Sequence, residues 1–128
     1  MKKLLPIGLL LILTACSRST DRDKTVKTLK SIQSWTATAR MVGEAWQEDR
    51  IPQQYARQTL IKSREEIAKE AKELPDPPTI VEQLKETISS LTDKIDRPDN
   101  VAFTTSLGKF STQQQQLDKF TKSQEQQP

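Results

Sequence analysis

The stretch TIVEQLKETISSLTDKID, residues 79–96, carries the clearest fold signal in the chain. Its apolar residues recur three or four positions apart, at Val81, Leu84, Ile88, Leu91 and Ile95. This spacing puts them on one face of an α-helix, which turns once every 3.6 residues or so, about 100° per residue. Thr79 and Glu82 have the spacing of a capping box, in which both side chains bond to backbone N–H groups where a helix starts. The stretch therefore predicts an amphipathic helix that begins near Thr79.

Two earlier segments have the same periodicity. The first is predicted over residues 24–48, with an apolar stripe formed by Val26, Leu29, Ile32, Trp35, Ala39, Val42 and Trp46. The second is predicted over residues 52–74, with a buried face formed by Ala56, Leu60, Ser63, Ile67, Ala71 and Leu74. Pro52 suits the first turn of this helix. The prolines of the LPDPP stretch, residues 74–78, end it, because proline lacks an N–H and disfavours the helical conformation of the preceding residue.

A fourth helix is predicted after the break at residues 96–100, which offers N-capping side chains. Its apolar stripe consists of Phe103, Leu107, Phe110, Leu117 and Phe120, with Gln114 in the one missing position. The STQQQQ segment, residues 111–116, has a low helix propensity for the middle of a helix. Its side chains are expected to form a solvated surface. This weakness leaves open whether the fourth segment packs firmly.

Four amphipathic helices joined by short breaks predict an all-α protein, an up-down-up-down four-helix bundle over residues 24–121. The alternative is a three-helix bundle with a loose fourth segment. Residues 122–128 are too polar to pack and are expected to form a mobile tail.

The composition excludes the common catalytic designs. The chain has no histidine, which is the commonest metal ligand and the commonest general base at neutral pH. P-loop, dinucleotide-binding and GxSxG motifs are missing from the sequence. The acidic residues of the second helix lie among bases, as on a solvated face. We therefore expect no catalytic residue, no metal and no cofactor, and we expect that the protein is not an enzyme.

The amino-terminal segment has the layout of a secretory signal. Lys2 and Lys3 are followed by an apolar run, Leu4–Leu13, that contains Pro6 and Gly8. Ten residues rise only ~15 Å in a helix, about half of the ~30 Å bilayer core. The run is therefore expected to be a cleaved signal and not a membrane-spanning anchor.

The residues that follow resemble the lipobox of bacterial lipoproteins: Leu13, Thr14, Ala15 and then Cys16, the single cysteine of the chain. The resemblance implies that signal peptidase recognises residues 13–15 and cleaves before Cys16. It also implies diacylglycerol on the cysteine sulfur and an acyl chain, such as palmitate, on the new amine. Residues 1–15 are then the signal peptide, and residues 16–23 are the lipidated N-terminus and tether. Ser17, in place of an aspartate, slightly favours the outer membrane.

Cleavage also changes the charge balance. The formal net charge is +3, but removing Lys2 and Lys3 leaves 18 basic and 17 acidic residues, a net charge of +1. This balance is not typical of nucleic-acid binding, so we expect no nucleic-acid partner. The bases closest to Cys16 outnumber Asp21 and Asp23 by about three charges, and two interpretations stay open: contact with anionic lipid headgroups, or an ordinary solvated tether. These bases are Arg18, Arg22, Lys24, Lys27 and Lys30.

Three aromatic residues form the only candidate ligand patch. Trp35 and Trp46 share a helix face three turns apart, and Tyr55 begins the next helix. We expect large aromatics to fill the core of a small bundle, and the alternative is a ligand pocket or docking patch. Ala39 and Gly43, also on the first helix, have a small-residue spacing that lets a neighbouring element approach closely.

These features together predict a protein lipid-anchored to a bacterial membrane, facing the periplasm, a lumen or the exterior. The expected function is that of a non-catalytic interaction or assembly factor. Its expected partners are the membrane, through the lipid on Cys16, and another membrane-associated protein. The alternative function is a binder or carrier of a small apolar ligand between the helices, near Trp35, Trp46 and Tyr55.

Overall fold

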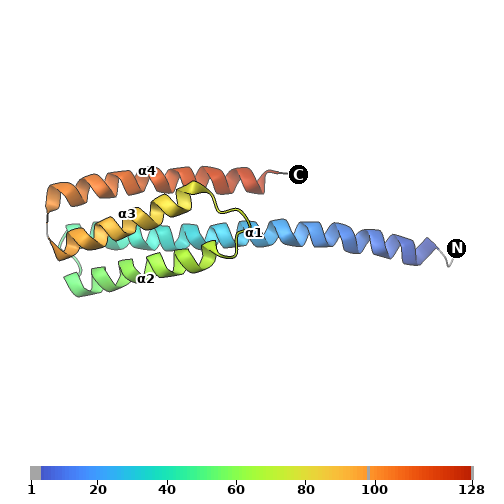
Figure 1. The fold of residues 1–128 in the computed structure, drawn as a ribbon, viewed down its shortest axis with the longest axis horizontal. Helices are drawn as coiled ribbons and strands as arrows, with labels where there is room; N and C mark the ends of the chain where they lie inside the picture. Colours follow the sequence, from blue (N-terminus) through green and yellow to red (C-terminus); the bar gives the residue numbers. More distant parts are fainter. Residues whose placement is uncertain (1–3, 98, 128) are drawn as a thin grey trace.

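A computed structural model describes the backbone of residues 4–97 and 99–127, and the side chains from residue 22 onward within those ranges. It contains four helices: α1 (Leu4–Gln47), α2 (Gln53–Ala71), α3 (Thr79–Asp96) and α4 (Asn100–Glu125). They run alternately up and down, side by side, as Figure 1 shows. The described ranges contain no strand. The predicted all-α four-helix bundle is therefore confirmed.

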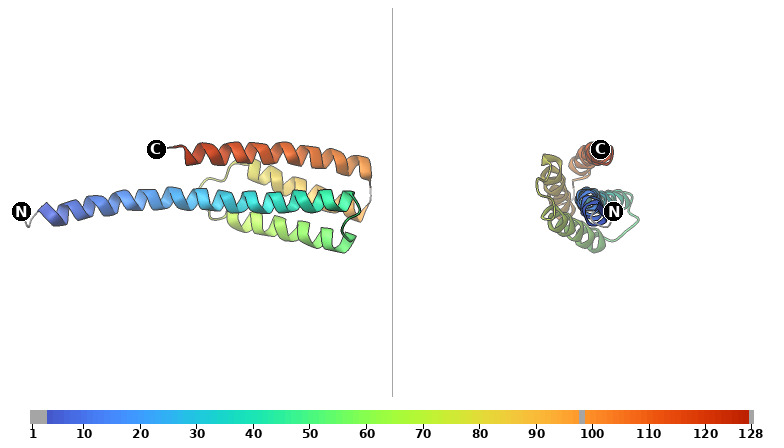
Figure 2. Two further views of the ribbon diagram at one scale, coloured as in Figure 1. Left: turned by 180° about the vertical axis from the view of Figure 1, so that it is seen from behind. Right: turned by 90° about the vertical axis from the view of Figure 1, so that its right-hand side faces the viewer.

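The helices close into a ring in chain order. Each helix contacts the next along the chain, and α1 contacts α4 to complete the circuit. α1 also touches α3 across one diagonal, whereas the described residues of α2 and α4 make no contact across the other. Since α4 packs along both α1 and α3 (Figures 1 and 2), the three-helix alternative with a loose fourth segment is wrong.

The core receives side chains from all four helices, from the stripes that the sequence predicts. Among the fully buried residues are Leu29 of α1, Leu60 of α2, Ile88 of α3 and Phe110 of α4. Branched aliphatic and aromatic side chains from four directions thus fill one continuous cluster. At ~25 cal/mol per Å² of apolar surface removed from water, this cluster is the main favourable contribution to folding.

The glutamine-rich middle of α4 is held by two neighbouring helices. Gln113, and not Gln114, faces the core, and it is only 6 % exposed. The Thr87 hydroxyl of α3 donates to its Oε1 at 2.7 Å. Gln114 accepts at 2.9 Å from Nη1 of Arg40 on α1. These bonds explain why a segment of modest helix propensity stays helical. Of the four glutamines that we expected on a solvated surface, only Gln115 and Gln116 are exposed.

The end of α1 and the start of α4 each have a defined cap. α1 ends in a Schellman motif: Arg50 N–H donates to the Ala45 carbonyl at 2.8 Å, and Asp49 N–H donates to the Trp46 carbonyl at 3.0 Å. Asp49 has the left-handed conformation that this motif requires, with φ 59°. At the start of α4, the predicted cap is confirmed, because the Asp99 side chain accepts from Ala102 N–H at 3.1 Å.

The predicted capping box at the start of α3 is wrong. Pro78 occupies the N-cap position with φ −68° and ψ 150°, and no side chain caps the helix. Thr79 is consequently the first helical residue, one position too late to act as the cap. Glu82 pairs instead with Lys85 of the same helix, at 2.7 Å.

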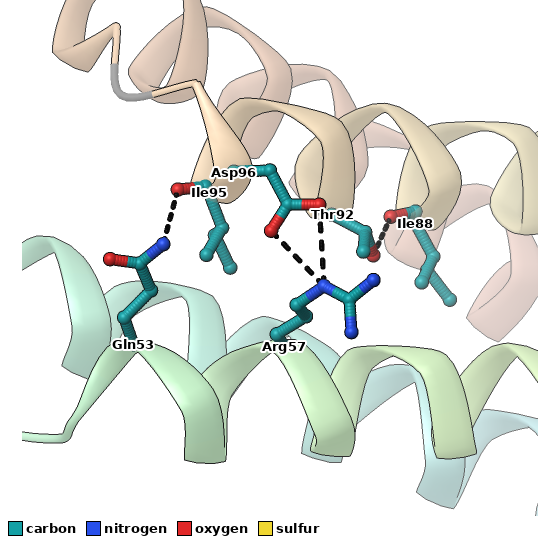
Figure 3. Close-up of polar contacts among 6 residues, drawn as sticks. All are labelled: Gln53, Arg57, Ile88, Thr92, Ile95 and Asp96. Carbon is teal, nitrogen blue, oxygen red and sulfur yellow. Dashed lines mark hydrogen bonds and ion pairs between the residues drawn. The ribbon is translucent and has the colours of Figure 1, made fainter.

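Polar contacts also fix the start of α2 to the end of α3, as Figure 3 shows. Gln53 Nε2 donates at 3.1 Å to the carbonyl of Ile95, one of the last four carbonyls of α3, which lack a partner within the helix. Arg57 Nε donates to both carboxylate oxygens of Asp96, at 3.1 and 3.2 Å. A cation at this position also suits the negative end of the α3 dipole.

Both chain ends continue further as helix than the sequence predicts. α1 begins at Leu4 and includes the expected tether, and its first part extends beyond the bundle (Figure 1). α4 extends to Glu125, whose carboxylate lies 3.1 Å from Nζ of Lys30 on α1. This ion pair holds part of the expected tail against α1. The division of the processed chain at Cys16 stays a prediction.

Candidate functional site

The lipobox residues lie in the first part of α1, and their side chains are outside the described residues. The structure therefore adds nothing about Leu13, Thr14, Ala15 or Cys16 beyond the helical backbone there. Among the described residues, no helix has the length and apolar character needed to cross a membrane.

The three predicted aromatic residues are not equivalent in the fold. Trp35 and Trp46 are partly buried and pack against the core. The Trp46 and Phe103 rings lie with their centroids 4.7 Å apart. Tyr55, in contrast, is 55 % exposed. The tryptophans thus lie at the edge of the core, and Tyr55 lies on the surface of α2.

The structure reveals a candidate site that the sequence reasoning missed, a polar groove between α3 and α4. Its volume is about 740 Å³. All of its lining residues are polar or charged: Gln83, Glu86, Thr87, Ser90, Lys94, Thr105, Ser106, Lys109, Thr112, Gln113 and Gln116. We call this feature the α3–α4 groove. A surface of this composition suits a ligand or partner that forms hydrogen bonds.

Lys94 organises one end of the groove. Its Nζ donates at 2.6 Å to Oγ of Ser90, one turn earlier on α3, and at 3.0 Å to Oγ of Ser106 on α4. The ammonium group therefore joins the two helices near the turn that connects them. We call these three side chains the Lys94 cluster. Its side chains are partly buried.

The base of the groove is closed by the bond between Thr87 and Gln113. Both residues are buried, at 5 % and 6 % exposed. The Thr87 hydroxyl also lies 3.0 Å from the carbonyl oxygen of Gln83. In the described part of the chain, every buried side-chain polar atom has a hydrogen-bond partner. The groove thus has a fixed polar floor beneath its more exposed walls.

The sequence contains a signal for this groove in its polar residues, which apolar periodicity does not detect. Four polar residues on α3, at 83, 87, 90 and 94, follow the helical spacing of four, three and four. The same spacing recurs on α4, at 105, 109, 112 and 116. Two polar stripes on helices adjacent in the chain would predict a polar seam between them.

The groove supplies binding groups more readily than catalytic ones. Serine nucleophiles work with a base that accepts their proton, whereas the Lys94 ammonium donates to both serines. The backbone N–H groups around Ser90 and Ser106 lie inside helices and are committed to helical bonds. No group of three possible metal ligands occurs in the described part of the molecule. The arrangement therefore offers hydrogen-bond donors and a positive charge.

An ion pair on α2 shifts the pKa values of both of its members. The side-chain hydrogen bond from Lys62 lowers the pKa of Glu66 below its usual value, and burial opposes this effect. The same hydrogen bond raises the pKa of Lys62. The two groups are 2.9 Å apart, one helical turn from each other at the i,i+4 spacing. This ion pair belongs to the solvated face of α2.

Comparison of the chain with models of protein families, with curated proteins and with solved structures finds no match.

Proposed function

We propose that this protein is a bacterial lipoprotein, anchored through lipid on Cys16, that acts as a non-catalytic interaction or assembly factor on the extracytoplasmic side of a membrane. The lipobox-like residues support the anchor. The α3–α4 groove supports the interaction, because it gives the bundle a polar surface with donors from two helices. Its polar lining favours a partner that forms hydrogen bonds over an apolar ligand.

One structural observation carries this proposal: the segment that follows Cys16 enters the bundle at the end where α4 finishes and where α2 connects to α3 (Figure 1). Arg22 donates to the Gln127 carbonyl there. Lys24 lines a hollow together with Glu73 and Pro75 of the α2–α3 connection. An anchor at Cys16 would hold this end close to the membrane. The α1–α2 and α3–α4 turns would then face away from it.

The charges at this end support the same orientation. Arg22, Lys24, Lys27 and Lys30 are exposed along the start of the bundle part of α1. Lys30 is paired with Glu125, and Asp23 offsets one further charge. The remaining bases would contact anionic headgroups, with about 1 kcal/mol for each well-placed base.

The anchor is tested by fractionating cells that express the wild-type chain, Cys16→Ser or the neighbouring control Ser17→Ala. The wild type and Ser17→Ala are expected in the membrane fraction with labelled palmitate, and Cys16→Ser without label and largely released. Equal membrane association and labelling of Cys16→Ser would contradict the proposal.

The interaction is tested by crosslinking in intact cells and mass spectrometry, with the same variants. The proposal expects a membrane-associated protein to be crosslinked through α3 and α4, and to be lost or reduced in Cys16→Ser. Crosslinks that are confined to the protein itself in the wild type would count against an interaction role.

A further inference from the structure

We infer that the Lys94 cluster is a binding site for an oxyanion, the carboxylate or phosphate group of a small polar ligand that lies in the α3–α4 groove. The inference depends only on the geometry of the groove and not on lipid attachment to Cys16.

The Lys94 cluster has hydrogen-bond donors that its own members do not use. A lysine ammonium has three N–H donors, and Lys94 uses two of them on Ser90 and Ser106. Each serine oxygen accepts from Lys94, so each hydroxyl proton must point away from it. The cluster thus has three donors left over: one N–H and two O–H groups. A carboxylate or phosphate oxygen binds strongly to a group of donors of which one is charged.

Neither serine of the cluster donates its hydroxyl proton within the described part of the protein. Most neighbouring hydroxyls on these helices donate to the backbone carbonyl four residues earlier. Thr92 does so to Ile88 at 2.9 Å, and Thr105 does so to Val101 at 3.0 Å. Ser90 and Ser106 differ, because their only bonds within the described residues are those they accept from Lys94. Their protons are therefore available to a ligand.

No described carboxylate lies within ion-pair distance of the Lys94 ammonium. Lys94 is nevertheless partly buried between two helices. A partly desolvated cation is stabilised by an anion that completes its shell. Lys109 of α4 and Glu86 of α3 also line the groove, so its formal charge is +1, and Lys94 is the lysine that bonds to both serines.

The rest of the groove indicates what else the ligand carries. From Gln83 to Lys94 the α3 wall runs roughly 16 Å, at ~1.5 Å per residue. Gln83, Thr112 and Gln116 line the part away from Lys94 and present amides and a hydroxyl. The ligand class is therefore a polar molecule with an oxyanion at one end and hydrogen-bonding groups along its length.

Anionic lipid headgroups carry the same oxyanion chemistry as a free ligand. The Lys94 cluster lies toward the α3–α4 turn, at the opposite end of the bundle from the place where α1 enters (Figure 1). We infer that the ligand is a free molecule and not a lipid headgroup, because an anchor on α1 would keep the headgroups at the end of the bundle where α1 enters. This choice of source rests on the proposed function, whereas binding at the Lys94 cluster does not.

The test uses the full chain in a non-ionic maltoside detergent, titrated at constant ionic strength with inorganic phosphate and separately with acetate. Backbone amide shifts are followed by NMR. We expect saturable shifts around residues 87–94 and 103–113 with at least one of the two anions. Lys94→Met is expected to weaken binding by about tenfold or more, and Ser106→Ala by a smaller factor. Lys69→Gln, an exposed lysine on α2, is the matched control and is expected to bind as the wild type does.

Three outcomes would overturn the inference. They are no saturable shift with either anion, equal binding by Lys94→Met, and an equal loss in Lys69→Gln. The helical circular dichroism of each variant is measured in parallel, and Ser106→Ala provides a second test should Lys94→Met misfold. A third titration adds phosphatidylglycerol to the micelles, and groove shifts that appear with this lipid alone would overturn the assignment to a free ligand.

Discussion

The rings of Trp46 and Phe103 lie with their centroids 4.7 Å apart and their planes tilted by 60°. This contact joins the end of α1 to the start of α4, the two helices most distant in the chain. Phe103 is fully buried, whereas Trp46 is only partly so. The tilted arrangement is favourable for aromatic pairs because the positive edge of one ring faces the negative face of the other.

Phe103→Ala is expected to lower the free energy of unfolding by about 3–5 kcal/mol, because it leaves a cavity between α1 and α4. The fluorescence of Trp46 should also shift to longer wavelength as water reaches the indole. Both are measured by urea unfolding in a Trp35→Phe background, in which Trp46 is the remaining tryptophan. A loss below about 1 kcal/mol would mean that Phe103 is not a core residue.

Gly43 and Gly108 form a matched pair for glycine-to-alanine changes in helix interiors. A Cβ at Gly108 would meet nothing within 4 Å, so Gly108→Ala should stabilise the protein by about 0.5–1 kcal/mol. A Cβ at Gly43 would lie 2.9 Å from Cδ2 of Leu107. That methyl group can shift at modest cost, so Gly43→Ala is expected within about 1 kcal/mol of the wild type.

A larger side chain at Gly43 would also approach Phe103, whose Cζ is 3.7 Å from the Cβ position. Gly43→Val is therefore expected to destabilise the bundle by about 1–3 kcal/mol. Thermal and urea unfolding of the three glycine variants provide the comparison. A gain from Gly43→Ala as large as that from Gly108→Ala would show that α1 and α4 do not pack closely at this point.

Asp49 is the residue of the Schellman motif with a positive φ, 59°. Glycine has no Cβ to clash in this conformation, so Asp49→Gly is expected to raise the free energy of unfolding by up to about 1 kcal/mol. Asp49→Val should lower it by about 1–2 kcal/mol, because a β-branched side chain strongly resists the left-handed conformation. The result is checked by urea unfolding. The opposite order of the two variants would contradict the Schellman ending of α1.

The pKa of Glu66 is expected to lie below its usual value in the folded protein, mainly through the hydrogen bond from Lys62. A depressed carboxyl pKa contributes stability above the unfolded pKa, and this contribution is lost as the pH falls through the folded value. NMR titration of the side chain measures the shift. Lys62→Gln should raise the pKa of Glu66 toward its usual value, and Lys69→Gln should raise it less, since Lys69 acts only through its charge. Equal effects of the two changes would contradict this order.

The helices could be predicted because the buried residues of a helix that packs on one face recur with the helical period. This recurrence is clear in α3. Ile88 and Leu91 are fully buried, as their positions on the stripe require. Helix starts were predicted less well, because side-chain capping competes with proline at the N-cap. Asp99 caps α4 as expected, whereas Pro78 displaces Thr79 from the cap of α3.

The candidate site could not be predicted from apolar periodicity, because it depends on polar side chains that meet across two helices. The bond from Lys94 to Ser106 joins residues on different elements, and its existence depends on how α3 and α4 rotate against each other. Rotation also decides that Gln113 is buried and Gln114 is not, although the two residues are adjacent. Conversely, Tyr55 was grouped with Trp46 by proximity in the sequence, and its position on α2 leaves it in solvent.

The closure of the ring between α1 and α4 has a consequence for biosynthesis. α1 is the first helix to leave the ribosome, and its packing is complete only when α4, the last helix, has been made. Phe103 and Leu107 of α4 pack on α1 near Gly43. Until residues beyond 100 have been made, the faces of α1 and α3 that contact α4 stay uncovered. An incomplete chain therefore exposes apolar surface that makes it a substrate for chaperones and prone to aggregate.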